Sequence, residues 1–224
     1  MSALARQFAA VRQQIAAAEQ AADRPAGSVL LLAVSKTKPV AQLAEAYRLG
    51  QRHFGENYLQ EALSKQQQMA AFNISWHFIG PIQSNKTKPI ASHFDWVHSV
   101  DRLKIAERLS EQRPDYLPPL NICLQVNISA EATKSGVSLE QLPQLVQQVA
   151  GLPRLRLRGV MAIPEPESDY QRQREPYRRL HQAVTGLEIK TLDTFSYGMS
   201  GDLEAAVAEG ATLVRIGTAL FGAR

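Results

Sequence analysis

A lysine follows an unbroken apolar run near the start of the chain. Residues 29–34 (VLLLAV) are all apolar, and Ser35 and Lys36 come directly after them. A strand that is apolar at every position is covered on both faces, as in parallel sheets wrapped by helices. Such folds bind ligands at the carboxyl ends of their strands, so Lys36 is a candidate for chemistry. Its amine could form an imine with a carbonyl compound. The alternative is a lysine that reaches from a strand end into solvent.

Two glycine-containing loops near the end of the sequence could bind phosphate. Residues 198–202 (GMSGD) follow one predicted strand, and Gly217 and Thr218 follow the next. Glycines permit close approach of the backbone, and Ser200 and Thr218 add hydroxyl groups. In barrel folds the loops after strands seven and eight commonly bind phosphate through backbone N–H groups. The alternative is that Ser200 caps a helix and that Gly217 is only a bend.

A lysine amine and a phosphate site in one place point to a ligand that has both an aldehyde and a phosphate. Pyridoxal 5′-phosphate has both, and Lys36 would form the imine with its aldehyde. Burial would favour this reaction, because a low dielectric lowers the pKa of a lysine and frees its amine. A sugar-phosphate aldolase of the Schiff-base type needs the same two features, so these residues alone leave the choice open.

The spacing of apolar residues predicts a regular alternation of strands and helices. Strands are expected at residues 29–37, 53–57, 75–80, 96–100, 120–127, 155–163, 191–197 and 212–217. An amphipathic helix over residues 2–22 precedes the first strand. About eight strand-then-helix units in one uninterrupted chain predict an α/β fold, a (β/α)₈ barrel forming a single domain over residues 1–224. An open doubly wound sheet is the alternative, although no Gly-x-Gly-x-x-Gly motif follows the first strand.

A barrel would gather residues that are distant in the sequence, because the carboxyl ends of all its strands face one mouth. We expect six residues to converge there: Lys36, Asn57, His77, Met161, Ser200 and Arg215. For His77 a structural role with a hydrogen-bonded ring is an equal alternative.

Composition excludes several other classes of protein. The 224 residues carry a net charge of +4, with 25 basic residues scattered among 21 acidic ones, so we expect no nucleic-acid partner. Cys123 is the single cysteine, which excludes an internal disulfide and fits a reducing compartment such as the cytoplasm. We expect no metal site, because the five histidines lack metal-binding spacing, and no membrane segment, because no apolar stretch approaches about 20 residues.

Long segments of the chain resemble one known family. They are residues 31–39 (LLAVSKTKP), 53–58 (HFGENY), 76–86 (WHFIGPIQSNK), 159–164 (GVMAIP), 198–202 (GMSGD) and 214–222 (VRIGTALFG). In order and spacing they resemble the YggS/PROSC family of pyridoxal phosphate homeostasis proteins, which is similar to the barrel domain of bacterial alanine racemase. The match is imperfect at Tyr197 and Gly201, where the family usually has other residue types; this concerns the shape of the phosphate loop.

The resemblance implies pyridoxal 5′-phosphate as the cofactor, held as a covalent imine on Lys36. It also implies that Ser200, Gly217 and Thr218 contact the phosphate and that Arg215 faces the pyridine nitrogen. The complete set of residues that we expect to bind the cofactor is Lys36, Asn57, His77, Met161, Met199, Ser200, Arg215, Gly217 and Thr218.

We therefore expect a cytoplasmic, monomeric and non-catalytic protein that takes part in intracellular pyridoxal phosphate homeostasis, with pyridoxal phosphate-dependent apoenzymes as candidate partners. A pyridoxal phosphate-dependent amino-acid racemase or decarboxylase is the alternative. Two-base racemisation needs an acid/base group on each face of the ring. In the similar racemases the second group is a tyrosine supplied across a dimer by a further C-terminal β domain. The sequence ends at Arg224, soon after the last predicted strand, so we expect that domain to be absent.

Overall fold

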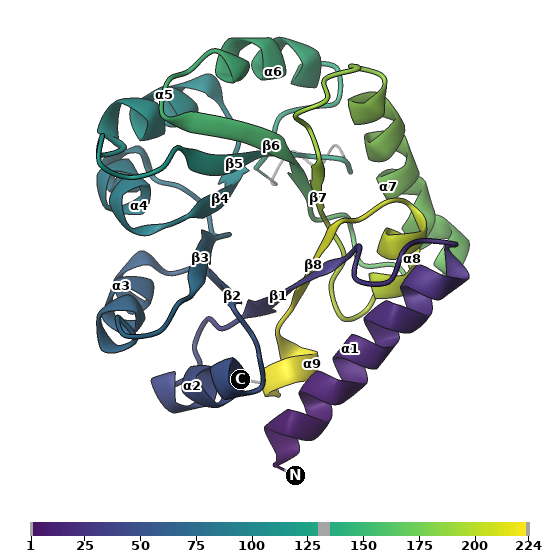
Figure 1. Ribbon diagram of the computed structural model, residues 1–224. Helices are drawn as coiled ribbons and strands as arrows, with labels where there is room; N and C mark the ends of the chain where they lie inside the picture. Colours follow the sequence, from purple (N-terminus) through teal and green to yellow (C-terminus); the bar gives the residue numbers. More distant parts are fainter. Residues whose placement is uncertain (1, 130–134, 223–224) are drawn as a thin grey trace.

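Eight parallel strands close into a barrel in the order of the sequence (Figure 1). The computed structural model describes residues 2–129 and 135–222. The last strand pairs with the first, with Leu32 opposite Arg215, which closes the sheet. The strands are β1 (Leu30–Val34), β2 (His53–Glu56), β3 (Ser75–Phe78), β4 (Trp96–Val100), β5 (Leu120–Val126), β6 (Leu155–Ala162), β7 (Thr194–Ser196) and β8 (Leu213–Ile216). The predicted barrel is confirmed, and the alternative of an open sheet is wrong.

A helix follows each strand and lies on the outside of the barrel (Figure 1). These helices are α2 (Val40–Arg48), α3 (Leu59–Gln68), α4 (Thr87–His93, preceded by the 3₁₀ turn η1, Ser84–Lys86), α5 (Leu103–Gln112), α6 (Leu142–Ala150), α7 (Tyr170–Thr185), α8 (Leu203–Ala208) and α9 (Thr218–Phe221). No helix in the described part of the chain has both the length and the apolar character needed to cross a membrane.

The predicted N-terminal helix is confirmed as α1 (Ala3–Ala21), which lies along α8 and α9 (Figure 1). Its buried face includes Phe8, whose ring meets that of Phe221 edge to face with centroids 5.9 Å apart. The buried Glu19 near its end accepts hydrogen bonds from the backbone N–H of Gly27 at 3.0 Å and of Val29 at 2.7 Å. The helix therefore also anchors the chain just before β1.

Successive side chains of β1 point alternately toward the helices outside the barrel and into the barrel itself. Leu31 and Ala33 belong to the apolar core that also contains the helix residues Leu43 and Ala46. Leu32 lies between them, is fully buried, and points to the other side of the sheet, into the barrel. Further along the barrel the interior becomes polar, because buried side chains of β3, β4, β7 and β8 carry nitrogen and oxygen atoms: His77, His98, Ser196 and Arg215.

The structure differs from the prediction mainly at the ends of elements. β1 ends at Val34, so Lys36 lies in the turn after the strand and not within it. β7 is only three residues long, whereas the sequence predicts a strand over residues 191–197. Lys134, which lies between β5 and α6 in the sequence, is outside the described residues.

A close contact between β6 and β7 requires a glycine at position 159. A Cβ atom there would lie 1.8 Å from the carbonyl oxygen of Thr194. We expect Gly159→Ala to lower the free energy of unfolding by about 3 kcal/mol, because the clash is with backbone atoms. Gly151→Ala is the matched control, since nothing lies within 4 Å of its Cβ position. Chemical denaturation measures both, and equal stability of the two variants would contradict the tight β6–β7 contact.

Candidate functional site

The turn that carries Lys36 is held by side chains of β2 and α3. Lys65 Nζ donates to the carbonyl oxygen of Ser35 at 2.7 Å, and the hydroxyl of Ser35 donates to Glu56 Oε1 at 2.5 Å. The backbone N–H of Thr37 donates to Glu61 Oε1 at 2.6 Å. Thr37 has a φ of 64°, in the left-handed region that most residues avoid. The backbone on both sides of Lys36 is therefore fixed by this network.

The centre of this network is a buried ion cluster. Lys65 Nζ lies 2.8 Å from Glu56 Oε1 and 2.5 Å from Glu61 Oε1. The side chain of Glu56 is fully buried, and burial raises its pKa although Lys65 opposes the shift. Removing one partner of such a cluster leaves an uncompensated buried charge. The cluster thus ties the conformation of the Lys36 turn to the stability of the fold.

Lys36 shares a small pocket with the loop after β8. The pocket has a volume of about 80 Å³, and Lys36, Lys38, Gly217 and Thr218 are among its lining residues. Gly217 lies close to β1, because a Cβ atom there would meet the carbonyl oxygen of Val34 at 3.3 Å. The barrel therefore brings Lys36, Gly217 and Thr218, which are distant in the sequence, to the lining of one pocket.

A larger cleft of about 320 Å³ opens between the ends of β2, β3, β5 and β6. Its lining includes Asn57, Ile79, Gln125, Asn127 and Ile163. The side-chain oxygen of Asn57 is buried and accepts no hydrogen bond from the described residues. Buried acceptors are rarely left without a donor, so this atom is suited to a hydrogen-bond donor of a ligand.

The loop after β7 is exposed at Met199, Ser200 and Gly201. The carbonyl oxygen of Gly198 accepts from the backbone N–H of Arg215 at 2.9 Å, which joins this loop to β8. Asp202 Oδ1 accepts from the backbone N–H of Met199 at 2.6 Å. Ser200 is exposed and lines a separate groove of about 200 Å³ with Tyr170. It does not cap α8, whose N-cap residue is Asp202, so the capping alternative is wrong.

Arg215 lies in the barrel interior below this loop. Its guanidinium donates from Nη1 to the carbonyl oxygen of Ser196, from Nη1 to the hydroxyl oxygen of Ser196 at 2.9 Å, and from Nη2 to the carbonyl oxygen of Ala162 at 2.9 Å. Burial lowers its pKa, but an arginine remains protonated in proteins. Met161 is buried next to Ala162 and lies opposite Ser196 in the β6–β7 register. These residues form the floor beneath the mouth of the barrel.

His77 lies in the interior, with both ring nitrogens in contact with other histidines. Its Nε2 is 3.0 Å from His53 Nδ1, and its Nδ1 is 2.8 Å from His98 Nε2. His98 Nδ1 in turn lies 2.7 Å from the hydroxyl of Ser196. Burial, with the nearby charge of Arg215, lowers the pKa of His98 to about 3, and burial lowers the pKa of His77 well below its usual value. Within the described ranges no group of three or more His, Cys, Asp or Glu side chains could hold a metal ion.

Sequence reasoning missed the residues that hold the site in place. The turn of Lys36 is fixed by Glu56, Glu61 and Lys65. Arg215 contacts Ser196, which in turn contacts His98. A usable signal was Glu56, a carboxylate within a buried strand directly before Asn57, because a buried charge requires a partner.

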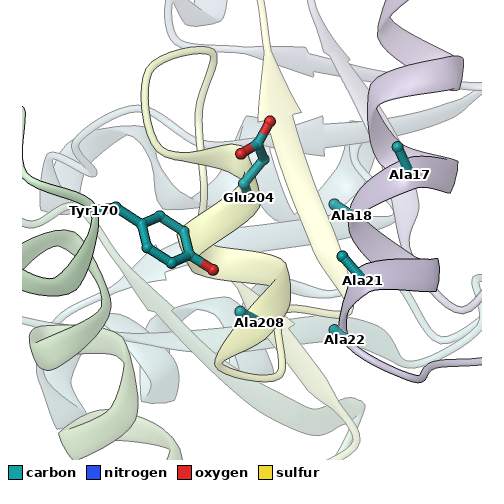
Figure 2. Close-up of a pocket in the computed structure, with 7 residues that line it drawn as sticks. All are labelled: Ala17, Ala18, Ala21, Ala22, Tyr170, Glu204 and Ala208. Atoms are coloured by element: carbon teal, nitrogen blue, oxygen red, sulfur yellow. The ribbon is translucent and has the colours of Figure 1, made fainter.

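Another cleft lies on the outside of the barrel, between α1, α7 and α8 (Figure 2). It has a volume of about 240 Å³, and alanines of α1 face Tyr170 and Glu204 across it. It contains none of the predicted site residues and no amine or phosphate-binding loop. We therefore place the candidate site at the barrel mouth.

Comparison with known proteins gives the class of this barrel. The family "Alanine racemase, N-terminal domain" matches residues 7–224. The chain is thus a barrel of the alanine racemase N-terminal domain class.

Curated relatives and solved structures narrow this class. The pyridoxal phosphate homeostasis protein of Pseudomonas aeruginosa is 62% identical over 224 residues, covering 100% of this chain and 97% of the relative. The protein of that name from Escherichia coli K12 is 54% identical over 229 residues, covering 100% and 98%. PipY of Synechococcus elongatus superposes with a TM-score of 0.88 at 37% identity without PLP and 0.85 at 36% with PLP bound, each covering 98% of this chain and 100% of PipY. This chain belongs to the family of pyridoxal phosphate homeostasis proteins, which confirms the resemblance found in the sequence.

The buried histidines predict a dependence of stability on pH. Below the usual histidine pKa of 6.5 the unfolded chain takes up a proton at His98, whereas the folded protein keeps His98 neutral down to about 3. The stabilisation is complete above pH 6.5 and is lost toward acid, at about 1.4 kcal/mol per pH unit for each such histidine.

We expect His98→Gln to reduce this slope by about 1.4 kcal/mol per pH unit between pH 6.5 and about 5. Denaturant unfolding at a series of pH values measures it, and the same substitution at the exposed His93 is the control. Raised carboxyl pKa values at Glu56 and Asp95 act in the opposite direction, but they are common to both proteins. Identical slopes for wild type and His98→Gln would show that folded His98 takes up a proton.

Proposed function

We propose that this protein binds pyridoxal 5′-phosphate, holds it as an imine on Lys36, and takes part in intracellular pyridoxal phosphate homeostasis without catalytic turnover. The observation that carries the proposal is the pocket in which Lys36 lies beside Gly217 and Thr218. The relatives' name and the PipY structure with PLP bound support the same ligand.

The residues at the mouth fit this cofactor in their chemistry. Lys36 would supply the amine for the aldehyde, and Thr218 and Gly217 would supply hydroxyl and backbone donors for the phosphate. We propose the same role for Ser200, although it lines a separate groove in this structure. Asn57 supplies a buried acceptor that lacks a donor among the described residues. We propose that Met161 and Met199 lie near the cofactor. We propose that His77 acts on it indirectly, through its hydrogen bond to His98.

Pyridoxal phosphate supplies an aldehyde for a lysine and a ring that can withdraw electrons from a bound amino acid. The ring does so best when its nitrogen is protonated, which a carboxylate partner promotes. Arg215 can only donate hydrogen bonds, so it favours an unprotonated ring nitrogen. Three of its N–H groups are used by Ser196 and Ala162, and its Nε has no acceptor among the described residues. We infer that this donor faces the ring and opposes catalysis.

We further propose that the protein acts in the cytoplasm as a monomeric single domain and that its partners are pyridoxal phosphate-dependent apoenzymes. The single, buried Cys123 fits a reducing compartment. A racemase or decarboxylase on this barrel remains the alternative function, since the residues that bind the cofactor would be the same.

Lys36→Ala tests the imine. We expect it to abolish labelling by borohydride in the presence of pyridoxal phosphate and to leave the fold intact, because the half-buried Lys36 side chain fills no core space. Lys38→Ala is the matched control from the same pocket, where Lys38 Nζ donates to the carbonyl oxygen of Gly222 at 3.0 Å. Peptide mapping of the wild type identifies the labelled residue, and a label on Lys38 would reject the assignment to Lys36.

Removal of the phosphate tests the loops after β7 and β8. We expect pyridoxal to bind far more weakly than pyridoxal 5′-phosphate, because charge-assisted hydrogen bonds are strong. The double variant Ser200→Ala, Thr218→Val should lose about tenfold or more in affinity for the phosphate form and little for pyridoxal, measured by absorbance titration. Equal losses for both ligands would mean that these hydroxyls do not bind phosphate.

Proton exchange tests the absence of turnover. We expect alanine and other amino acids to exchange their α-hydrogen with heavy water no faster in the presence of the loaded protein than with free pyridoxal phosphate. NMR measures this loss, and Arg215→Glu should accelerate it if the cofactor stays bound. Exchange well above that of the free cofactor would favour the racemase or decarboxylase alternative.

A further inference from the structure

A continuous hydrogen-bonded chain of side chains crosses the barrel interior. It runs from His53 to His77 at 3.0 Å, from His77 to His98 at 2.8 Å, from His98 to the hydroxyl of Ser196 at 2.7 Å, and from that hydroxyl to Arg215 Nη1 at 2.9 Å. The contact between His98 and Ser196 joins β4 to β7, which are not neighbours in the sheet, so it spans the interior. His53 is the only half-buried member, at the start of β2.

Arg215 sets the direction of every hydrogen bond in this chain. An arginine only donates, so Ser196 Oγ accepts from it. The only described acceptor for the proton of Ser196 is His98 Nδ1. A neutral imidazole that accepts at one nitrogen donates from the other, so His98 donates from Nε2 to His77 Nδ1. His77 then donates from Nε2 to His53 Nδ1, with Ser75 Oγ at 3.4 Å as a weaker second partner.

This direction matters because the positive charge of Arg215 is buried and, among the described residues, has no carboxylate in direct contact. In the described part of the chain its guanidinium forms no salt bridge, and its acceptors are two carbonyl oxygens and the Ser196 hydroxyl. The dipoles of these acceptors therefore compensate the loss of hydration, together with the Coulombic effect of nearby groups such as Asp202. The histidine chain turns the oxygen of Ser196 toward the cation and gives its proton an acceptor on the far side.

The rings have little freedom to change this arrangement. His77 is stacked on Trp96, with centroids 5.5 Å apart and planes at 9°. Arg158 lies over the same indole ring, 4.9 Å from its centroid. Both His77 and His98 are fully buried.

We propose that His98 and His77 are positioning residues for Arg215: they orient the Ser196 hydroxyl and so hold the guanidinium in one place beneath the mouth. The role of that guanidinium toward the cofactor ring rests on the function proposed above. The positioning of the guanidinium is a property of the protein without cofactor, and the cofactor-free protein is therefore used to test it.

The first test is nitrogen NMR of the cofactor-free protein labelled with ¹⁵N-histidine. We expect His98 and His77 each to carry a single proton, on Nε2, near neutral pH. A proton on Nδ1 of either ring would overturn the proposal, because the chain would then run the other way or be broken.

The second test separates hydrogen bonding from packing. We expect the guanidinium protons of Arg215 to exchange with water about tenfold faster in His98→Phe than in wild type. His98→Asn, which fills less space but can accept from Ser196, should restore slow exchange, whereas a packing role predicts the reverse order. Ser196→Ala removes the hydroxyl that accepts directly from Arg215 and adds no bulk, so it shows the exchange expected when this hydrogen bond is lost, and His98→Phe should match it. His93→Phe is the exposed control, and wild-type exchange in the Ser196→Ala variant would overturn the proposal.

The exchange of the Arg215 protons and the formation of the imine on Lys36 can fail independently, so the two proposals can be distinguished. If Arg215 responds but no imine forms on Lys36, the proposed function fails and the positioning stands. If the imine forms but Arg215 does not respond, the positioning fails and the proposed function stands.

Discussion

The pairing of β8 with β1 is the constraint on which the rest of the structure depends. It closes the sheet and brings the first and last strands side by side, with Ala33 opposite Ile216. Lys36 and Gly217, which lie near opposite ends of the sequence, thereby line one pocket. The helix α1 reinforces this closure, because it packs on α9 and anchors the start of β1 through Glu19. The site exists only because the barrel is closed.

Two polar networks hold Lys36 and Arg215 in position at the candidate site. One is the ion cluster of Lys65, Glu56 and Glu61, which holds the turn of Lys36 from the outside of β1 and β2. The other is the chain of histidines that ends at Ser196 and Arg215. Both contain buried groups that are costly unless they are fully bonded. The stability of the fold and the geometry of the mouth are therefore maintained by the same contacts.

The barrel could be predicted from the sequence because it leaves a local signal: apolar runs mark the strands. Lys36 stands out as a candidate for the same reason, since it comes just after the end of one such run. The polar networks leave no comparable signal, since His53, His77 and His98 stand on separate strands and meet only when these become neighbours. The position of Ser200 was also beyond sequence reasoning, because the groove that it lines with Tyr170 depends on how the loop after β7 meets α7.

We propose that this barrel binds pyridoxal 5′-phosphate with its ring nitrogen unprotonated, a state in which the ring withdraws electrons less strongly than a protonated pyridinium does. The most direct measurement is the NMR shift of that nitrogen, using cofactor labelled with ¹⁵N in the ring and bound to the wild-type protein. We expect the shift of a neutral pyridine that accepts a hydrogen bond from Arg215, and we expect this shift to stay constant across neutral pH. The shift of a protonated pyridinium would contradict it.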